Sequence, residues 1–203
     1  MIELDKKGAV WTITLNRPEK ANSLTEAMLE RLIEIVREGR DLRALILTAK
    51  GKVFSAGADL EEVQSKNLAL SGLWEELSGE ISDLPGLSVA ALNGTLAGGA
   101  MGMALACDLR IAVPGARFFY PVLKRGVLPQ PSDPRRMAAL IGPARTKLIL
   151  MAGQKISADE AYSFGLVDRI VEPDMLLSEA ESLLEDACSA DAEIVSGISR
   201  LCR

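Results

Sequence analysis

Two stretches of this chain follow the same order, namely an apolar run, a glycine-containing turn and then a helix-like pattern. The first leads from the run 44–47 to the turn Ser55–Asp59, and the second leads from the run Ser88–Leu92 to the turn Leu96–Gly102. Apolar runs that do not alternate with polar residues are typical of parallel strands buried on both faces. This weak internal repeat predicts stacked strand–helix units whose two turns lie side by side.

The two turns also indicate a chemical role, because each leads from a strand into a helix. The first backbone N–H groups of a helix have no partner within it, and they stabilise a nearby anion. Gly98 and Gly99 allow the main chain to approach a ligand more closely than a bulky side chain would permit. The pair of turns predicts an oxyanion hole made of main chain, whereas packing alone is the alternative explanation for each glycine turn.

The composition excludes several kinds of site. The 203 residues include no histidine, which removes Ser-His and Cys-His catalytic pairs, histidine-ligated zinc and the commonest general base at neutral pH. Cys107, Cys188 and Cys202 are too far apart for a metal knuckle, so we expect no metal and a reduced, cytoplasmic setting. The net charge of −5 and the lack of a basic cluster argue against a nucleic-acid partner.

A stretch without charged residues, from Leu84 to Cys107, is long enough to raise the question of a membrane span. Pro85 and the glycines would weaken such a helix, and no basic flank precedes it. A buried strand, turn and helix explains the stretch better. The residues Met1–Asp5 lack the basic and apolar regions of a signal peptide. We therefore expect neither a membrane span nor a leader.

Periodicity and turn signals predict an α/β chain without a linker, and hence one domain over residues 1–203. A hairpin is expected from residues 2–5 and 9–15, and strands are expected over 43–48, 88–92 and 109–113. Helices are expected over about 24–38 and 68–83, the first with a capping box at Ser23–Glu26 and a stop at Gly39. Further helices are expected after Ser132-Asp133, Pro143, the capping box Ser157–Glu160 and Pro173-Asp174.

Several motifs, in order and at consistent spacing, resemble those of the crotonase, or enoyl-CoA hydratase/isomerase, superfamily. They are Asn16-Arg17-Pro18-Glu19-Lys20, Phe54-Ser55-Ala56-Gly57-Ala58-Asp59-Leu60, Asn93-Gly94 through Gly98-Gly99 to Ala106-Cys107-Asp108, and Ile156-Ser157-Ala158-Asp159-Glu160-Ala161 with Gly165-Leu166-Val167. The resemblance implies a crotonase-like (ClpP/crotonase) spiral of repeated ββα units, with two roughly perpendicular sheets. The spiral core would cover residues 1–140, and a helical C-terminal region, shorter than usual for the family, would cover 141–203.

The resemblance also implies roles for individual residues. The N–H groups of Ala58 and Gly99 would form an oxyanion hole that holds the carbonyl of a coenzyme A thioester and stabilises its enolate, and one such preorganised donor contributes roughly 3–4 kcal/mol. Lys20 and Ala21 fall where the family contacts the adenosine end of coenzyme A, although a solvated surface lysine equally explains Lys20. The main chain of Ala56 falls where the adenine is read. The other substrate-binding candidates are Gly57, Asp59, Leu60, Gly98 and Val122.

Two positions depart from the family pattern. The hydratases carry one catalytic glutamate that aligns here with Gly102 and a second that aligns with Val122, so this chain has neither carboxylate. A general acid or base contributes typically about 10²–10⁴ to the rate, so we do not expect rapid hydration of an enoyl-CoA. The resemblance therefore supports binding of the thioester more directly than it supports hydration.

Substitute acids or bases have three candidates in and near the loop 126–133. Gln130 falls near a position that carries an aspartate in a dehalogenase branch of the family, and Asp133 and Tyr120 are the nearest titratable side chains. Structural explanations compete with two of these roles. Asp133 could instead cap the helix that follows it, and Tyr120 could be a core or interface aromatic beside Phe118 and Phe119.

We therefore expect an acyl-CoA-processing enzyme of the lyase or isomerase class, of the kind found in fatty acid metabolism. Its reaction would be isomerisation, decarboxylation or hydrolysis of a coenzyme A thioester, with no covalently bound cofactor. By resemblance it would assemble as a homotrimer or hexamer. The alternatives are a non-catalytic or weakly catalytic acyl-CoA-binding protein of the same fold and, less favoured, a structural oligomer without a ligand.

Overall fold

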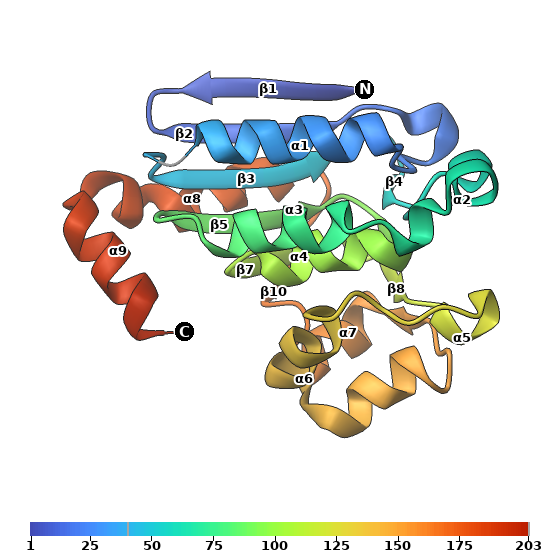
Figure 1. Cartoon of the computed structure of the whole chain (residues 1–203). Helices are drawn as coiled ribbons and strands as arrows, with labels where there is room; N and C mark the ends of the chain where they lie inside the picture. Colours follow the sequence, from blue (N-terminus) through green and yellow to red (C-terminus); the bar gives the residue numbers. More distant parts are fainter. Residues whose placement is uncertain (40, 203) are drawn as a thin grey trace.

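A six-stranded sheet runs through the centre of the computed structural model, which describes residues 1–39 and 41–202 (Figure 1). The strands β1 (Ile2–Lys7) and β2 (Val10–Leu15) form the predicted antiparallel hairpin. The sheet then continues in parallel through β3 (Ala44–Ala49), β5 (Leu87–Leu92), β7 (Leu109–Ala112) and β10 (Arg169–Ile170). Every residue of β3 is buried, as its unbroken apolar run predicts.

A second sheet holds the two glycine turns. It has the order β4 (Val53–Ser55), β6 (Thr95–Ala97), β8 (Arg117–Phe119) and β9 (Ile156–Ser157). The strands β4 and β6 are parallel neighbours, and each of them ends at a glycine turn. Because the carboxyl ends of parallel neighbours lie at the same edge of a sheet, the two turns are adjacent, which confirms the arrangement predicted from the repeat.

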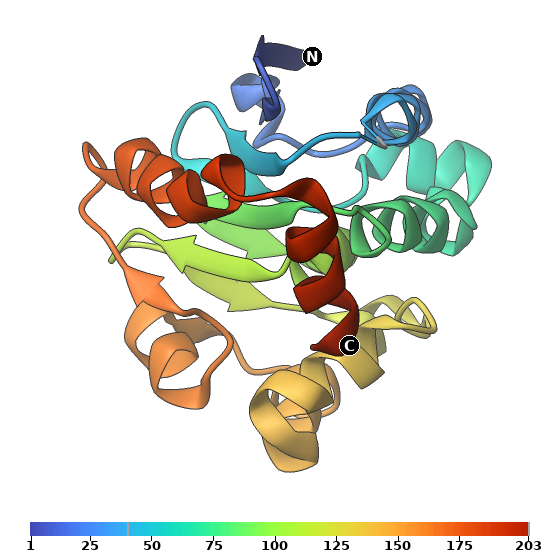
Figure 2. The same ribbon diagram turned by 90° about the vertical axis from the view of Figure 1, so that its left-hand side faces the viewer.

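Helices cover both faces of the larger sheet (Figures 1 and 2). On one face lie α1 (Glu26–Glu38), α3 (Leu73–Ser82) and α4 (Met101–Ala106), and on the other lies α8 (Leu176–Ser189). The short turns η1 (Pro18–Lys20), η2 (Leu68–Leu70) and η3 (Gly98–Ala100) and the helix α2 (Leu60–Lys66) connect strands to helices. The remaining helices are α5 (Val122–Arg125), α6 (Asp133–Leu150), α7 (Ala158–Phe164) and α9 (Ala192–Leu201).

The uncharged stretch from Leu84 to Cys107 forms β5, β6, η3 and α4 in the middle of the hydrophobic core. All six residues of α4 are buried, so the stretch is apolar because it is enclosed by protein. Over the ranges 1–39 and 41–202, the structure contains no helix with the length and hydrophobicity needed to cross a membrane.

The helix boundaries differ from the prediction where tertiary contacts compete with local signals. The N-cap of α1 is Thr25, whose side chain accepts a hydrogen bond from the Met28 N–H, and not Ser23. The Ser23 hydroxyl instead contacts Arg17 and Asp59. The capping box at Ser157–Glu160 is confirmed, with both of its hydrogen bonds present.

The C-terminal region is less purely helical than predicted. It supplies β9 to the second sheet and β10 to the edge of the first. Within α6, Gly142 has φ of 77° and interrupts the helix, so that Pro143 starts the second helical part as predicted. Residue 203, the last of the predicted region, lies outside the described residues.

Candidate active site

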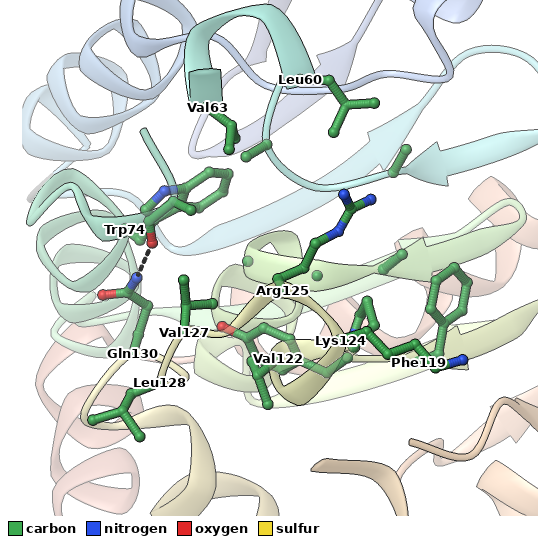
Figure 3. A pocket seen from close by; sticks show the side chains of 18 residues that line it. Leu60, Val63, Trp74, Phe119, Val122, Lys124, Arg125, Val127, Leu128 and Gln130 are labelled. Atoms are coloured by element: carbon green, nitrogen blue, oxygen red, sulfur yellow. Dashed lines mark hydrogen bonds between the residues drawn. The ribbon is translucent and has the colours of Figure 1, made fainter. Parts of the chain in front are cut away.

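A cavity of about 420 Å³ opens beside the two glycine turns, a size suited to a small-molecule ligand (Figure 3). Its wall combines the turns after β4 and β6, the helices α2 and α3, and the segment 119–130. The lining residues are Ala56, Ala58, Leu60, Val63, Ala69, Trp74, Ala97, Gly98, Gly99, Phe119, Tyr120, Pro121, Val122, Lys124, Arg125, Val127, Leu128 and Gln130. The predicted site residues Ala56, Ala58, Leu60, Gly98, Gly99, Tyr120, Val122 and Gln130 therefore share one cavity.

The two turns touch at Gly57, which needs the freedom of glycine. Gly57 has φ of +90°, and a Cβ built on it would lie 2.9 Å from the Ala97 carbonyl oxygen and 3.4 Å from the Gly99 nitrogen. A larger residue here would be strained and would push the turns apart. Gly57 does not line the cavity, and its role is to set the distance between the two turns.

Backbone donors are available at both turns. Among the described residues, the Ala58 N–H donates to no protein acceptor, although the N–H groups of Gly57 and Asp59 on either side both do. Gly99 is the second residue of η3, which continues directly into α4, so its N–H belongs to a first helical turn without an intrahelical acceptor. The cavity wall therefore contains two residues, Ala58 and Gly99, whose backbone N–H groups have no acceptor in the adjoining helical turn or strand.

Trp74 is a site residue that the sequence analysis missed. A Cβ on Gly99 would lie 3.2 Å from the Trp74 ring, so the indole packs directly against the turn and leaves little room for a side chain there. The Trp74 indole N–H donates to the Leu68 carbonyl at 2.8 Å, which fixes the ring. A single buried tryptophan in the helical stretch 68–83 was the available signal, but nothing local tied it to a turn that follows so much later in the chain.

The proposed adenosine contacts lie around the first turn but mostly outside the cavity wall. Lys20 is exposed and pairs with Glu61 at 3.2 Å between Nζ and Oε1. The Ala21 carbonyl accepts from the Ala56 N–H at 3.0 Å, which places these two candidates beside each other. The structure thus brings Lys20, Ala21 and Ala56 to the same side of β4, and their contacts with coenzyme A stay predictions.

Asp59 serves the fold at this edge of the cavity. Its carboxylate accepts from the N–H groups of Glu61 and Glu62 at the start of α2, and it pairs with Arg17 at 2.6 Å. The hydrogen bond from Arg17 is the largest influence on the carboxyl and holds the pKa of Asp59 below its usual value. Asp59 anchors the loop that presents the Ala58 N–H, and it does not line the cavity.

A buried pair of titratable groups lies at the base of the cavity. The Tyr120 hydroxyl donates to Asp133 Oδ2 at 3.0 Å, and Asp133 is fully buried while Tyr120 is 5 % exposed. Asp133 is the first residue of α6, and its side chain makes no capping hydrogen bond, so the capping explanation from the sequence is wrong. Tyr120 lines the cavity, whereas Asp133 lies behind it and reaches the cavity only through the phenol.

Burial shifts the pKa values of both Asp133 and Tyr120. The pKa of Asp133 is raised to about 7, mainly by removal from water; within this net shift the hydrogen bond from Tyr120 lowers the pKa, Glu75 raises it and Arg136 lowers it. Burial also raises the pKa of Tyr120, so the phenol stays protonated at neutral pH. Asp133 Oδ1 is buried without a hydrogen-bond partner among the described residues. Such a carboxyl exchanges a proton near neutral pH, where no histidine competes.

Gly102 lies against this carboxyl. A Cβ on Gly102 would be 2.7 Å from Asp133 Oδ1, so the space beside Gly102 is filled by an acid that comes from α6. Gly102 follows Gly99 by three positions, about one helical turn, on the same continuous helical segment. The acid is therefore close to the two turns even though no aspartate or glutamate of the described residues lines the cavity.

The rim of the cavity carries positive charge that the sequence analysis also missed. Lys124 and Arg125, in the last turn of α5, line the cavity, and the Arg125 guanidinium extends toward the side that holds Leu60 (Figure 3). Val63, Trp74 and Val127 add apolar side chains to the wall of the cavity (Figure 3). Gln130 donates to the Ala69 carbonyl at 3.4 Å and closes this wall. The part of the chain that the structure describes has no cluster of three or more potential metal ligands.

Comparison with known proteins decides the family. A model of the enoyl-CoA hydratase/isomerase family matches residues 5–198. The chain belongs to this family. It is 34 % identical over 189 residues to a short-chain-enoyl-CoA hydratase of Clostridium acetobutylicum, covering 89 % of this chain and 72 % of that protein. The crotonase family and fold predicted from the sequence motifs are thereby confirmed, and the chain is an enzyme-family member with enoyl-CoA hydratases among its relatives.

Solved structures agree with this assignment. The enoyl-CoA hydratase of Bacillus anthracis superimposes with a TM-score of 0.91 at 32 % identity, covering 98 % of this chain and 81 % of the other. An enoyl-CoA hydratase/isomerase from Pseudoalteromonas atlantica T6c gives a TM-score of 0.90 at 29 % identity, covering 99 % and 82 % respectively. The crotonase-like fold of the chain thus rests on its sequence relatives and on its backbone together.

Proposed function

We propose that the cavity binds an acyl-CoA thioester and that the N–H groups of Ala58 and Gly99 hold its carbonyl oxygen. Two donors on one oxygen favour the enolate over the neutral thioester, because negative charge develops on that oxygen when a group is removed from the adjacent carbon. The observation that carries the proposal is the adjacency of two unpartnered donors, fixed by the contact of Gly57 with Ala97. Membership of the enoyl-CoA hydratase/isomerase family supports the choice of a thioester.

The rest of the cavity suits the parts of such a ligand. The apolar wall of Val63, Trp74 and Val127 offers contacts for an acyl chain, and the cations Lys124 and Arg125 favour the phosphates of coenzyme A. No metal enters this scheme, since the donors are backbone amides. The reaction would be an isomerisation or a decarboxylation, both of which pass through the enolate, or a hydrolysis, in which the same donors would hold the oxyanion of the tetrahedral intermediate.

A weakly catalytic acyl-CoA-binding protein remains the second candidate. The observation that favours it is the absence of a carboxylate from the cavity wall of the described residues. The two candidates agree on one prediction, which is that crotonyl-CoA hydration by the native protein is negligible. A spectrophotometric assay that follows loss of the conjugated enoyl thioester absorption of crotonyl-CoA measures this rate, and rapid turnover would contradict the alignment of Gly102 and Val122 with the hydratase glutamates.

The carbonyl contact can be tested by infrared difference spectroscopy of butyryl-CoA labelled with carbon-13 at its carbonyl. We expect the bound carbonyl stretch to move to lower frequency than in water, because two donors polarise the bond. Gly57→Ala should abolish the shift, since its Cβ separates the turns, whereas Gly115→Ala, with open space around the new Cβ, is the matched control. A thioester that binds the native protein with its free-solution frequency would refute the proposal.

We also propose that the protein is a homotrimer or hexamer. Ile194, Ile198 and Leu201 recur at helical spacing on α9 and are 60 %, 57 % and 88 % exposed. An exposed apolar stripe of this kind favours burial against another protein surface. Light scattering coupled to size-exclusion chromatography measures the assembly directly, and a monomer at micromolar concentration would contradict it.

A further inference from the structure

We propose that Tyr120 is the group that transfers a proton to and from the carbon next to the thioester carbonyl, with Asp133 behind it as the proton reservoir. The inference rests on the proposed function, because it needs an enolate in the same cavity. Tyr120 is the catalytic residue here, since it lines the cavity with Ala58 and Gly99. Asp133 is a positioning residue, since it reaches the ligand only through the Tyr120 hydroxyl.

The geometry of the pair supports a relay. The hydroxyl donates to Asp133 Oδ2 at 3.0 Å, so the phenolic proton already points at an acceptor. In the forward step the C2 proton of the thioester moves to Tyr120 Oη while the phenolic proton moves to Asp133 Oδ2. The electron pair of the C2–H bond becomes the enolate, and its charge is held by the two backbone donors. In the reverse step the carboxyl returns its proton through the phenol to C2.

The unused oxygen of Asp133 is a second and independent observation. Oδ1 is fully buried and without a partner among the described residues, and it fills the space that Gly102 leaves beside α4. An unpaired buried oxygen is unfavourable, and this cost is offset where the carboxyl is used to gain and release a proton. The acid is thus delivered by α6 to the helix position at which a family glutamate is missing.

The groups around Asp133 set the charge of the pair. Glu75 on α3 accepts from the Ser132 hydroxyl and backbone at 3.0 and 3.2 Å. Arg136 on α6 donates to the hydroxyls of Ser132 and Ser78. Both Glu75 and Arg136 bind Ser132, and their effects on the pKa of Asp133 oppose each other, since Glu75 raises it and Arg136 lowers it. The carboxyl accepts a proton from Tyr120 only in its ionised form, and the relay should therefore become faster as the pH rises through about 7.

The test is the exchange of the C2 protons of butyryl-CoA with D₂O, followed by NMR. Tyr120→Phe should slow exchange at least about 100-fold without changing the affinity for butyryl-CoA more than about threefold. Tyr162→Phe, an exposed tyrosine on α7, is the matched control and should leave the rate unchanged. Exchange by Tyr120→Phe within about threefold of the native rate would overturn the proposal.

A second measurement tests the relay even if Tyr120→Phe fails to fold. The native exchange rate should rise with pH and level off above about 7, and Asp133→Asn should remove this dependence along with most of the rate. A native exchange rate that stays constant between about pH 5.5 and 8.5 would overturn the relay, because this interval extends roughly one unit or more on either side of the Asp133 pKa. If the infrared shift of the bound carbonyl persists while exchange is absent, the relay fails and the proposed function stands. If butyryl-CoA does not bind at all, both fail.

Discussion

Replacement of Asp133 by asparagine should make the protein more stable at alkaline pH. A carboxyl whose pKa is raised by folding binds its proton more tightly in the folded state, so its contribution to stability is greatest below the unfolded pKa. The contribution is lost as the pH rises through the folded pKa, which is about 7 for Asp133 against an ordinary value of 3.8. The loss is therefore confined to the interval between these two values.

The size of this loss in unfolding free energy follows from the number of pH units over which only the folded state keeps the proton. One proton costs about 1.4 kcal/mol for each pH unit in which only the unfolded state has released it. Between pH 5 and 7 the folded protein should thus lose about 2 kcal/mol of unfolding free energy through this one group, because about half of the folded molecules have already released the proton at pH 7. Asp133→Asn cannot ionise and should show no such loss, although it keeps the shape of the side chain beside Tyr120.

Urea denaturation at about pH 5, 6, 7 and 8 measures the unfolding free energy of the native protein and of Asp133→Asn. The difference between the two at each pH isolates the contribution of Asp133. The chain is favourable for this measurement because it has no histidine to titrate in the same interval. Asp174→Asn, an exposed aspartate in the loop before α8, is the matched control and should keep the native pH profile. A native stability that is constant or rises between pH 5 and 7 would show that Asp133 is ionised throughout, and the reasoning would be refuted.

Three further predictions concern the edges of the site. Asp59→Ala removes a helix cap and leaves the half-buried Arg17 without its partner, so it should lower the unfolding free energy by roughly 2–4 kcal/mol in urea titrations. Gly102→Ala places a Cβ 2.7 Å from Asp133 Oδ1 and should slow C2 exchange while the affinity for butyryl-CoA is kept; unchanged exchange would show that the carboxyl can move freely. Ile198→Asp on α9 should reduce the assembled fraction in light scattering without lowering the helix content measured by circular dichroism, and an unaltered assembly would place the interface elsewhere.

The parts of the fold that were predictable from the sequence depend on neighbours along the chain. An unbroken apolar run is enough to predict β3 as a strand buried on both faces, and the glycines after β4 and β6 mark turns wherever those strands pack. The strands β9 and β10 have two residues each, too few to show any period, and they exist because β8 and β7 present open edges to them. Local patterns therefore describe the long elements and miss the short ones.

The candidate site likewise has one part that local sequence patterns predict and one part that they do not. Turn chemistry predicts backbone donors at the two glycine turns, and the resemblance to the family selects Ala58 and Gly99 among them. The pairing of Tyr120 with Asp133 depends on how the irregular loop between β8 and α6 folds back beneath α4, and no local rule describes that path. The capping rule even favours the wrong role for Asp133, because an aspartate at the start of a helix caps it unless a stronger partner lies within reach.

The free energy that burial of the ionised Asp133 carboxyl costs is itself an argument about the role of this residue. An asparagine at this position could accept from the Tyr120 hydroxyl and would avoid the penalty of a buried charge, which between pH 5 and 7 amounts to about 2 kcal/mol. The carboxyl offers only one property that the amide lacks, namely the gain and loss of a proton near neutral pH. Because no aspartate or glutamate of the described residues lines the cavity, and the chain contains no histidine, that property is available to a bound thioester only through Tyr120. A stabilising Asp133→Asn substitution that also abolishes C2 exchange would join these two consequences in a single protein.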